Sequence, residues 1–143
     1  MWERWLEERI GKTGTQSVVA DCEIETSVFH QMPARMLPVM PTGQLVSLVE
    51  AVAYDLVNDG MPGEYRTVGS VINLVHVAPT PRGQRVTAQV TLSRVEGTRC
   101  DFDVIVTDEV EQVASGRYSS HIVSIDRFLK KVNKKSSRCP LPD

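Results

Sequence analysis

The sequence predicts an α+β domain in which one long helix is wrapped by a curved antiparallel sheet of five strands. One stretch, 42–58, has apolar residues at helical spacing. Five shorter stretches alternate apolar and polar residues, which is typical of strands with one buried face. The sheet needs a cover for its apolar face and the helix needs to be wrapped, so the two satisfy each other in one layered domain.

Before the long helix, the sequence predicts a short helix, one strand and a proline-rich loop. Residues 1–15 form an extension, in which 2–10 is expected to be a short amphipathic helix ended by glycines. Residues 17–26 alternate with period two and predict the first strand. Residues 30–41 contain three prolines, which fix φ and remove backbone donors, so this segment is predicted to be a loop.

The long helix is expected to run from Thr42 to about Asn58. The Thr42 side chain can cap the free amides of the first turn, and Asp59-Gly60 ends the helix. The apolar stripe is broad, which indicates a helix that is wrapped rather than laid on a surface. Its members are Leu45, Leu48, Val49, Val52, Ala53, Leu56 and Val57.

The remaining strands are expected to follow one another as an antiparallel meander. They are predicted at 68–78, 85–95, 98–107 and 110–125. A five-stranded sheet has edge strands with unpaired backbone groups, which favours pairing with a second subunit. A final helical turn is expected over 126–132, followed by a flexible basic tail at 134–143.

Length and composition predict a single domain, 1–143, without nucleic-acid or membrane functions. The net charge of -2 lacks the basic footprint of a nucleic-acid binder. No apolar run approaches the ~18 residues of a membrane span, and the acidic N-terminus does not resemble a signal peptide, so a cytoplasmic protein is expected. Three widely spaced cysteines, Cys22, Cys100 and Cys139, favour neither a disulfide framework nor a zinc site.

Thr42, Glu50 and His76 are the candidate catalytic residues. A hydroxyl, a carboxylate and an imidazole in one cleft can activate water against an acyl group. Eight residues of helix rotate Glu50 by about 80° from Thr42, so the two face similar directions. Glu50 lies among apolar neighbours, where desolvation is expected to raise its pKa. Each residue also has an ordinary structural role, as a helix cap, a solvated glutamate or a core histidine.

Two motifs carry a resemblance to a known family. They are Thr42-Gly43 followed by Glu50, and Thr67-Val68-Gly69 followed by 76–83. Together they resemble the hot-dog-fold thioesterases, most closely the fluoroacetyl-CoA thioesterase family, from about residue 16 to residue 133. The resemblance implies a hot-dog fold and a homodimer with the active site between two subunits. It implies catalytic roles for Thr42, Glu50 and His76, and it places Gly69 against the thioester.

The sequence departs from the family pattern at two places. Met36 stands where the fluoroacetyl-specific enzyme has a phenylalanine gate, so Met36 is expected to shape the acyl pocket. The family's Gly-Thr-His-Glu-Arg reads Gly116-Arg117-Tyr118-Ser119-Ser120 here, so Ser120 replaces a substrate-contacting arginine. Arg117 is the expected substitute, with His121 as the alternative. Gly43, at the helix N-terminus, is expected to offer a backbone donor to the substrate.

The resemblance implies an acyl-CoA thioesterase that hydrolyses a small or medium acyl thioester to free acid and CoA. Coenzyme A is then part of the substrate, and no separate cofactor or metal is expected. The substrate carrier is coenzyme A or an acyl-carrier protein. Two alternatives stay open from the residues: a non-catalytic acyl-CoA binding module, and a hot-dog dehydratase acting on 3-hydroxyacyl thioesters.

Overall fold

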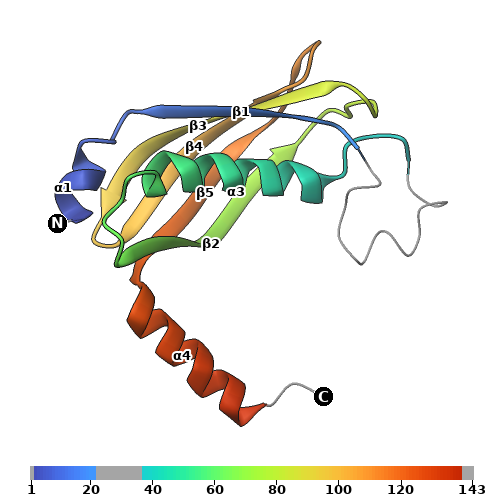
Figure 1. Cartoon of the computed structure of the whole chain (residues 1–143). Coiled ribbons are helices and arrows are strands. Elements are labelled where there is room, and N and C mark those ends of the chain that lie inside the picture. The colour runs from blue at the N-terminus through green and yellow to red at the C-terminus, as the bar shows by residue number, and fades with distance from the viewer. Residues whose placement is uncertain (1, 22–36, 140–143) are drawn as a thin grey trace.

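A computed structural model of the protein describes residues 2–21 and 37–139. The described helices and strands are α1 (Trp2–Glu7), β1 (Thr13–Val19), α3 (Thr42–Asn58), β2 (Tyr65–His76), β3 (Arg85–Glu96), β4 (Arg99–Thr107), β5 (Gln112–Ser124) and α4 (Ile125–Arg138). Figure 1 shows a curved sheet wrapped around α3, with α4 projecting away from the body. The predicted α+β architecture of one wrapped helix and five antiparallel strands is confirmed.

The strand order in the sheet is β1-β3-β4-β5-β2, and every neighbouring pair is antiparallel. The predicted four-stranded meander is therefore correct only for β3, β4 and β5. β2 pairs with β5 instead of β3, because the segment 77–84 between β2 and β3 contains Pro79 and Pro81 and is too long and too irregular for a tight hairpin. As a result β1 and β2 form the two edges of the sheet.

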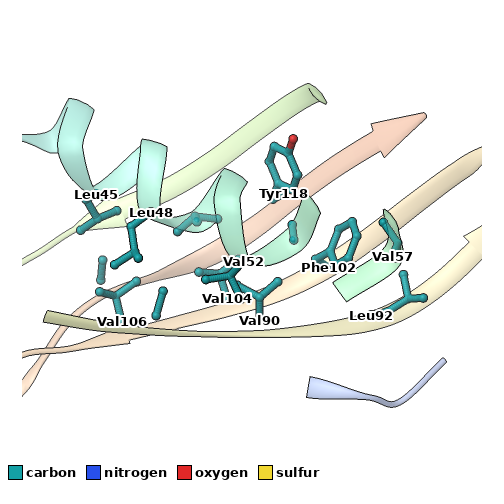
Figure 2. Packing of buried hydrophobic residues seen from close by; sticks show 14 of the residues in the cluster. Leu45, Leu48, Val52, Val57, Val90, Leu92, Phe102, Val104, Val106 and Tyr118 are labelled. Carbon is teal, nitrogen blue, oxygen red and sulfur yellow. The ribbon is translucent and has the colours of Figure 1, made fainter. Parts of the chain in front are cut away.

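The core lies between α3 and the inner face of the sheet (Figure 2). Alternate residues of β3 and β4 are buried, as the period-two pattern predicts. Phe102 and Tyr118 stack in a tilted pair with ring centroids 5.8 Å apart. The side chains that α3 buries are Gln44, Leu45, Leu48, Val49, Val52, Ala53, Val57 and Asn58. Each large apolar side chain buried here contributes roughly 1.5–3 kcal/mol to folding, which holds α3 firmly in the sheet.

The bounds of α3 agree with the sequence prediction, but the predicted cap is wrong. Pro41 occupies the N-cap position and makes no side-chain cap hydrogen bond, while Thr42 is the first helical residue. At the other end, the Asn58 side chain ties α3 to β2. Its Nδ2 donates to Thr67 Oγ1 at 2.7 Å, and its Oδ1 accepts from the Thr67 amide at 3.0 Å. These bonds fix the helix against the strand that carries Gly69 and His76.

The ends of the chain differ from the sequence prediction in two respects. β1 runs from Thr13 to Val19 rather than over 17–26, and the part of that prediction beyond residue 21 lies outside the described residues, as does Met36. α4 continues to Arg138, although only a turn over 126–132 and a tail from residue 134 were expected. Lysine is a good helix former, and cations near a helix C-terminus complement its dipole, which explains the extension. Within residues 2–21 and 37–139 no helix is long and apolar enough to cross a membrane.

Candidate active site

Thr42 and His76 meet at the junction of α3 and β2. Thr42 Oγ1 lies 3.0 Å from His76 Nδ1, within hydrogen-bond distance. Because Pro41 holds the cap position, the Thr42 hydroxyl is not used to cap the helix and can bind the imidazole instead. The other ring nitrogen, His76 Nε2, is buried and has no hydrogen-bond partner among the described residues. An unpartnered buried nitrogen of this kind is costly, and it is typical of a group that acts on a ligand.

The Thr42–His76 pair opens onto a pocket of about 370 Å³. The pocket is lined by Val39, Met40, Pro41, Thr42, His76, Val77, Ala78 and Pro79. The first N–H groups of a helix have no partner within the helix, so the start of α3, including Gly43, presents backbone donors beside this pocket. We call the residues that line this pocket the Thr42–His76 half-site.

Glu50 and Gly69 line a second pocket, of about 320 Å³. Its lining residues are Ser47, Glu50, Ala51, Tyr54, Thr67, Gly69 and Tyr118, and we call them the Glu50–Gly69 half-site. The Glu50 side chain is exposed in the single chain, so the expected shielding by apolar neighbours is not found there. The Glu50 side chain points away from the face of α3 that the sheet covers, and residues 48, 49 and 52 occupy that buried face.

Gly69 lies at an irregularity of β2. The pairing of β2 with β5 shifts register between Gly69 and Val71, which is the bulge that a strand glycine suggests. The Tyr118 hydroxyl packs against Gly69 so closely that any side chain at position 69 would collide with it. The absence of a side chain therefore leaves the backbone of Gly69 accessible to the second pocket.

Tyr118 is the site residue that the sequence did not reveal. Burial, and secondarily the negative charge of Glu50, raise the pKa of the Tyr118 phenol above its usual value. The phenol therefore stays protonated near neutral pH and can donate a hydrogen bond in the Glu50–Gly69 half-site. The alternation of β5 predicts that Tyr118 faces inward, but nothing in the sequence shows that its hydroxyl reaches Gly69.

The structure brings Thr42 to His76 and Glu50 to Gly69, but it keeps the two pairs apart within one chain. Eight residues of helix separate Thr42 from Glu50 by about 12 Å along the axis. Seven residues of strand separate Gly69 from His76 by about 23 Å. Thr42 and Glu50 were expected to face similar directions around the helix, but that does not reduce their separation along the helix axis. One chain thus carries two half-sites, one at the C-terminal end of β2 and one in its N-terminal half.

Other candidate residues lie outside both pockets. Arg117 is on the outer face of β5, exposed, with its Nε 3.7 Å from Asp103 Oδ1. His121 Nδ1 lies 3.3 Å from Thr98 Oγ1, and Ser120 is buried opposite Gly69 in the sheet. Burial raises the pKa of the Cys100 thiol to about 11, so this cysteine is not a nucleophile near neutral pH. In the part of the chain that the structure describes, no group of three metal-binding side chains occurs.

Comparison with known proteins decides which family this fold and these pockets represent. The model of the fluoroacetyl-CoA-specific thioesterase family matches residues 23–126. The chain is 32% identical over 113 residues to the fluoroacetyl-CoA thioesterase of Streptantibioticus cattleyicolor, covering 78% of each protein. The chain belongs to the fluoroacetyl-CoA-specific thioesterase family. The thioesterase membership predicted from the sequence is thus confirmed.

Solved structures of this family and of more distant proteins share the fold. The fluoroacetyl-CoA thioesterase FlK superposes with a TM-score of 0.80 at 27% identity, over 89% of this chain and 96% of that one. A mutant of that thioesterase in complex with fluoroacetate and CoA gives a TM-score of 0.74 at 27% identity, over 84% and 98%. A thioesterase superfamily member from Thermus thermophilus, 18% identical, gives 0.80 over 90% and 93%, which shows the fold alone.

Proposed function

We propose that this protein is a homodimeric acyl-CoA thioesterase whose active site joins the Thr42–His76 half-site of one chain to the Glu50–Gly69 half-site of its partner. The reaction is hydrolysis of a small or medium acyl thioester to a free acid and CoA. Family membership supports thioester hydrolysis, and a relative that holds fluoroacetate and CoA supports a CoA thioester as substrate. The observation that carries the proposal is the position of the two half-sites on one free edge strand, one at the C-terminal end of β2 and one in its N-terminal half.

β2 is suited to pair with a second copy of itself. It is the last strand of the sheet, so one side of its backbone has no neighbouring strand in the described chain. Val71, Ile72 and Val75 on it are 56%, 42% and 59% exposed, which is unusual for aliphatic residues of a central strand. An exposed apolar edge strand is a template for further pairing, and two identical strands that pair antiparallel generate a two-fold dimer.

Face alternation limits the register of such a pair. Ile72, Leu74 and His76 pair with inward-facing positions of β5, and the odd-numbered residues between them face outward. In an antiparallel pair, directly opposed residues lie on the same face of the sheet. An inward-facing, even-numbered residue of one β2 must therefore oppose an even-numbered residue of the other, so the two residue numbers have an even sum. A register with Asn73 on the two-fold axis meets this condition, and it opposes Ile72 to the partner's Leu74.

This register brings the half-sites together. Beyond Val71 the strand bulges at Gly69 and Ser70, and that bulge then lies opposite the partner's His76. Opposed residues of antiparallel strands have Cα atoms about 4.5–5.5 Å apart, so the Gly69 backbone and the partner's imidazole border one crevice. Glu50 shares a pocket with Gly69 and therefore faces the same crevice. Dimer formation also shields Glu50, which is exposed in the single chain.

The chemistry follows from the groups that meet there. Backbone amides near Gly69 and at the start of α3 polarise the thioester carbonyl. Glu50 takes a proton from water as the water oxygen attacks the carbonyl carbon, or attacks that carbon directly to give an anhydride that water then cleaves. The C–S bond breaks, and His76, held by Thr42, supplies a proton to the departing thiolate. The products are the free acid and the thiol of CoA.

The test is release of free thiol from a panel of acyl-CoA substrates by the wild-type protein and by Glu50→Gln. A general base typically contributes about 10²–10⁴-fold, so Glu50→Gln should lower kcat at least about tenfold while the dimer stays folded. An unchanged kcat would remove Glu50 from the mechanism. Binding of acyl-CoA without thiol release would favour a binding module, and water addition to an enoyl thioester would favour a dehydratase.

A further inference from the structure

α4 (Ile125–Arg138) is a helix that the rest of the single chain leaves exposed. None of its residues is buried, and it projects from the end of β5 beyond the β2 side of the sheet (Figure 1). Its apolar residues recur at helical spacing and form one stripe about 100° wide. The stripe consists of Ile125, Phe128, Leu129 and Val132, of which the last three are 37%, 49% and 46% exposed.

The rest of the α4 surface is strongly basic. Six cationic side chains and one carboxylate give the helix a charge of +5, in a chain whose net charge is -2, so the remainder carries -7. When placed at 100° per residue, five of the six cations lie on the side away from the apolar stripe, and Lys135 lies beside the stripe, next to Phe128. The six cations are Arg127, Lys130, Lys131, Lys134, Lys135 and Arg138. No salt bridge links these side chains to any carboxylate in the described residues.

The start of α4 is fixed beside the free edge of the sheet. The Ile125 amide donates to the Glu64 carbonyl at 3.0 Å, and Ser124 is paired with Tyr65, the first residue of β2. In the dimer register proposed above, the first residues of β2 lie beside the partner's segment that follows His76. That segment, 77–79, lines the mouth of the Thr42–His76 pocket. In this register α4 therefore begins next to the mouth of the partner's Thr42–His76 pocket.

We propose that α4 extends across the subunit boundary and that its lysine and arginine side chains bind the phosphate groups of the CoA substrate at the crevice formed by its own Glu50–Gly69 half-site and the partner's Thr42–His76 half-site. The proposal rests on the thioesterase function and adds a set of cationic side chains to the proposed site. Fourteen residues of helix extend about 21 Å, so the cations continue outward from the pocket mouth along the substrate's route. Ammonium groups bind phosphate as point charges and tolerate several geometries, which suits a nucleotide end held loosely at a surface.

The apolar stripe fits the same arrangement, with a second copy of the chain as its occupant. A 14-residue helix is marginal in water unless it packs against something, and the monomer offers α4 no cover. The partner's body has the opposite charge to α4, and α4 leaves the sheet on the edge where that body docks. With the stripe seated on the partner, the cationic side is left facing solvent and the substrate.

The experiment compares two substrates that carry the same acyl group. Acyl-CoA contains the phosphates, and acyl-N-acetylcysteamine keeps the thioester without them. The variant is K130Q/K131Q/K134Q/K135Q, and the matched control is Lys12→Gln, an exposed lysine before β1 at the far edge of the sheet. Since one exposed charge pair is typically worth about 1.4- to fivefold, four substitutions at about 1.8-fold each should raise KM for acyl-CoA about tenfold. KM for acyl-N-acetylcysteamine, kcat for both substrates and the Lys12→Gln constants should not change.

Two outcomes would overturn the proposal while leaving the thioesterase function intact. One is hydrolysis of both substrates with equal KM changes, or none, in the four-lysine variant. The other is a KM effect confined to an acyl-carrier-protein substrate, which would show that α4 binds an acidic protein rather than phosphate. Absence of thiol release from either substrate by the wild-type protein would instead overturn the proposed function itself.

Discussion

The shared active site can be tested by combining two inactive chains in one dimer. Glu50→Gln removes the base from one half-site, and His76→Ala removes the imidazole from the other. In a heterodimer of these variants, one crevice receives both substitutions and the other receives neither. With one intact site out of two, purified heterodimer should show about half of the wild-type kcat per dimer. Each homodimer alone should lose at least about tenfold.

The reciprocal heterodimer provides the control. It joins a wild-type chain to a chain that carries both Glu50→Gln and His76→Ala. If the half-sites combine across subunits, each crevice then contains one substitution and the dimer is inactive. If one chain builds its own site, this heterodimer keeps half of the activity and the first one is inactive.

The assay is thiol release by heterodimers purified through two different affinity tags. The geometry predicts opposite results for the two arrangements, because within one chain the half-sites are about 12 Å apart along α3 and about 23 Å apart along β2. An active reciprocal heterodimer, together with an inactive Glu50→Gln/His76→Ala pair, would refute the composite site. It would also refute the register with Asn73 on the two-fold axis.

Two further predictions concern the packing beside the site. Gly69→Ala places a methyl group against the Tyr118 hydroxyl and should lower stability by about 1–3 kcal/mol in urea unfolding, a loss that Tyr118→Phe should partly restore. Equal losses with and without Tyr118→Phe would contradict this contact. The pKa of Cys100 is raised from 9.0 to about 11 by burial, so the native state holds its proton more tightly than the unfolded chain. Stability should therefore fall as pH rises from about 9 to about 11, and Cys100→Ala should flatten that part of the profile in thermal melts, whereas an unchanged slope would contradict it.

The long helix and most strands could be predicted from the sequence because their patterns are local. Apolar spacing gave α3 at Thr42–Asn58, and alternation gave β3 and β4 within a residue or two of their observed bounds. Strand order could not be obtained in this way. The alternation in β2 is the same whether it pairs with β3 or with β5, and only the long connection at 77–84 hints that it crosses to the other edge.

The candidate site was predictable in its members and not in its arrangement. Residue types and spacing indicated Thr42, Glu50 and His76, the family resemblance added Gly69, and the structure places all four in pockets. Their catalytic roles stay predictions. The 3.0 Å contact of Thr42 with His76 depends on Pro41 occupying the N-cap position. The sequence does not reveal this, because a threonine at the start of a helix is itself a common N-cap. The contact of Tyr118 with Gly69 could not be predicted, because it joins two strands that are distant in the sequence.

The division of the site into two halves has a physical rationale in the fold. α3 is covered on its buried face by the sheet, so a carboxylate on α3 must point away from the core, where Glu50 is exposed. An exposed carboxylate is well hydrated. In the dimer proposed above, pairing of β2 with a second copy would remove that water only when the dimer forms, on the side of the crevice where the thioester would lie. The proposed arrangement would therefore keep the monomer core free of buried charge and still place a shielded base at the subunit boundary.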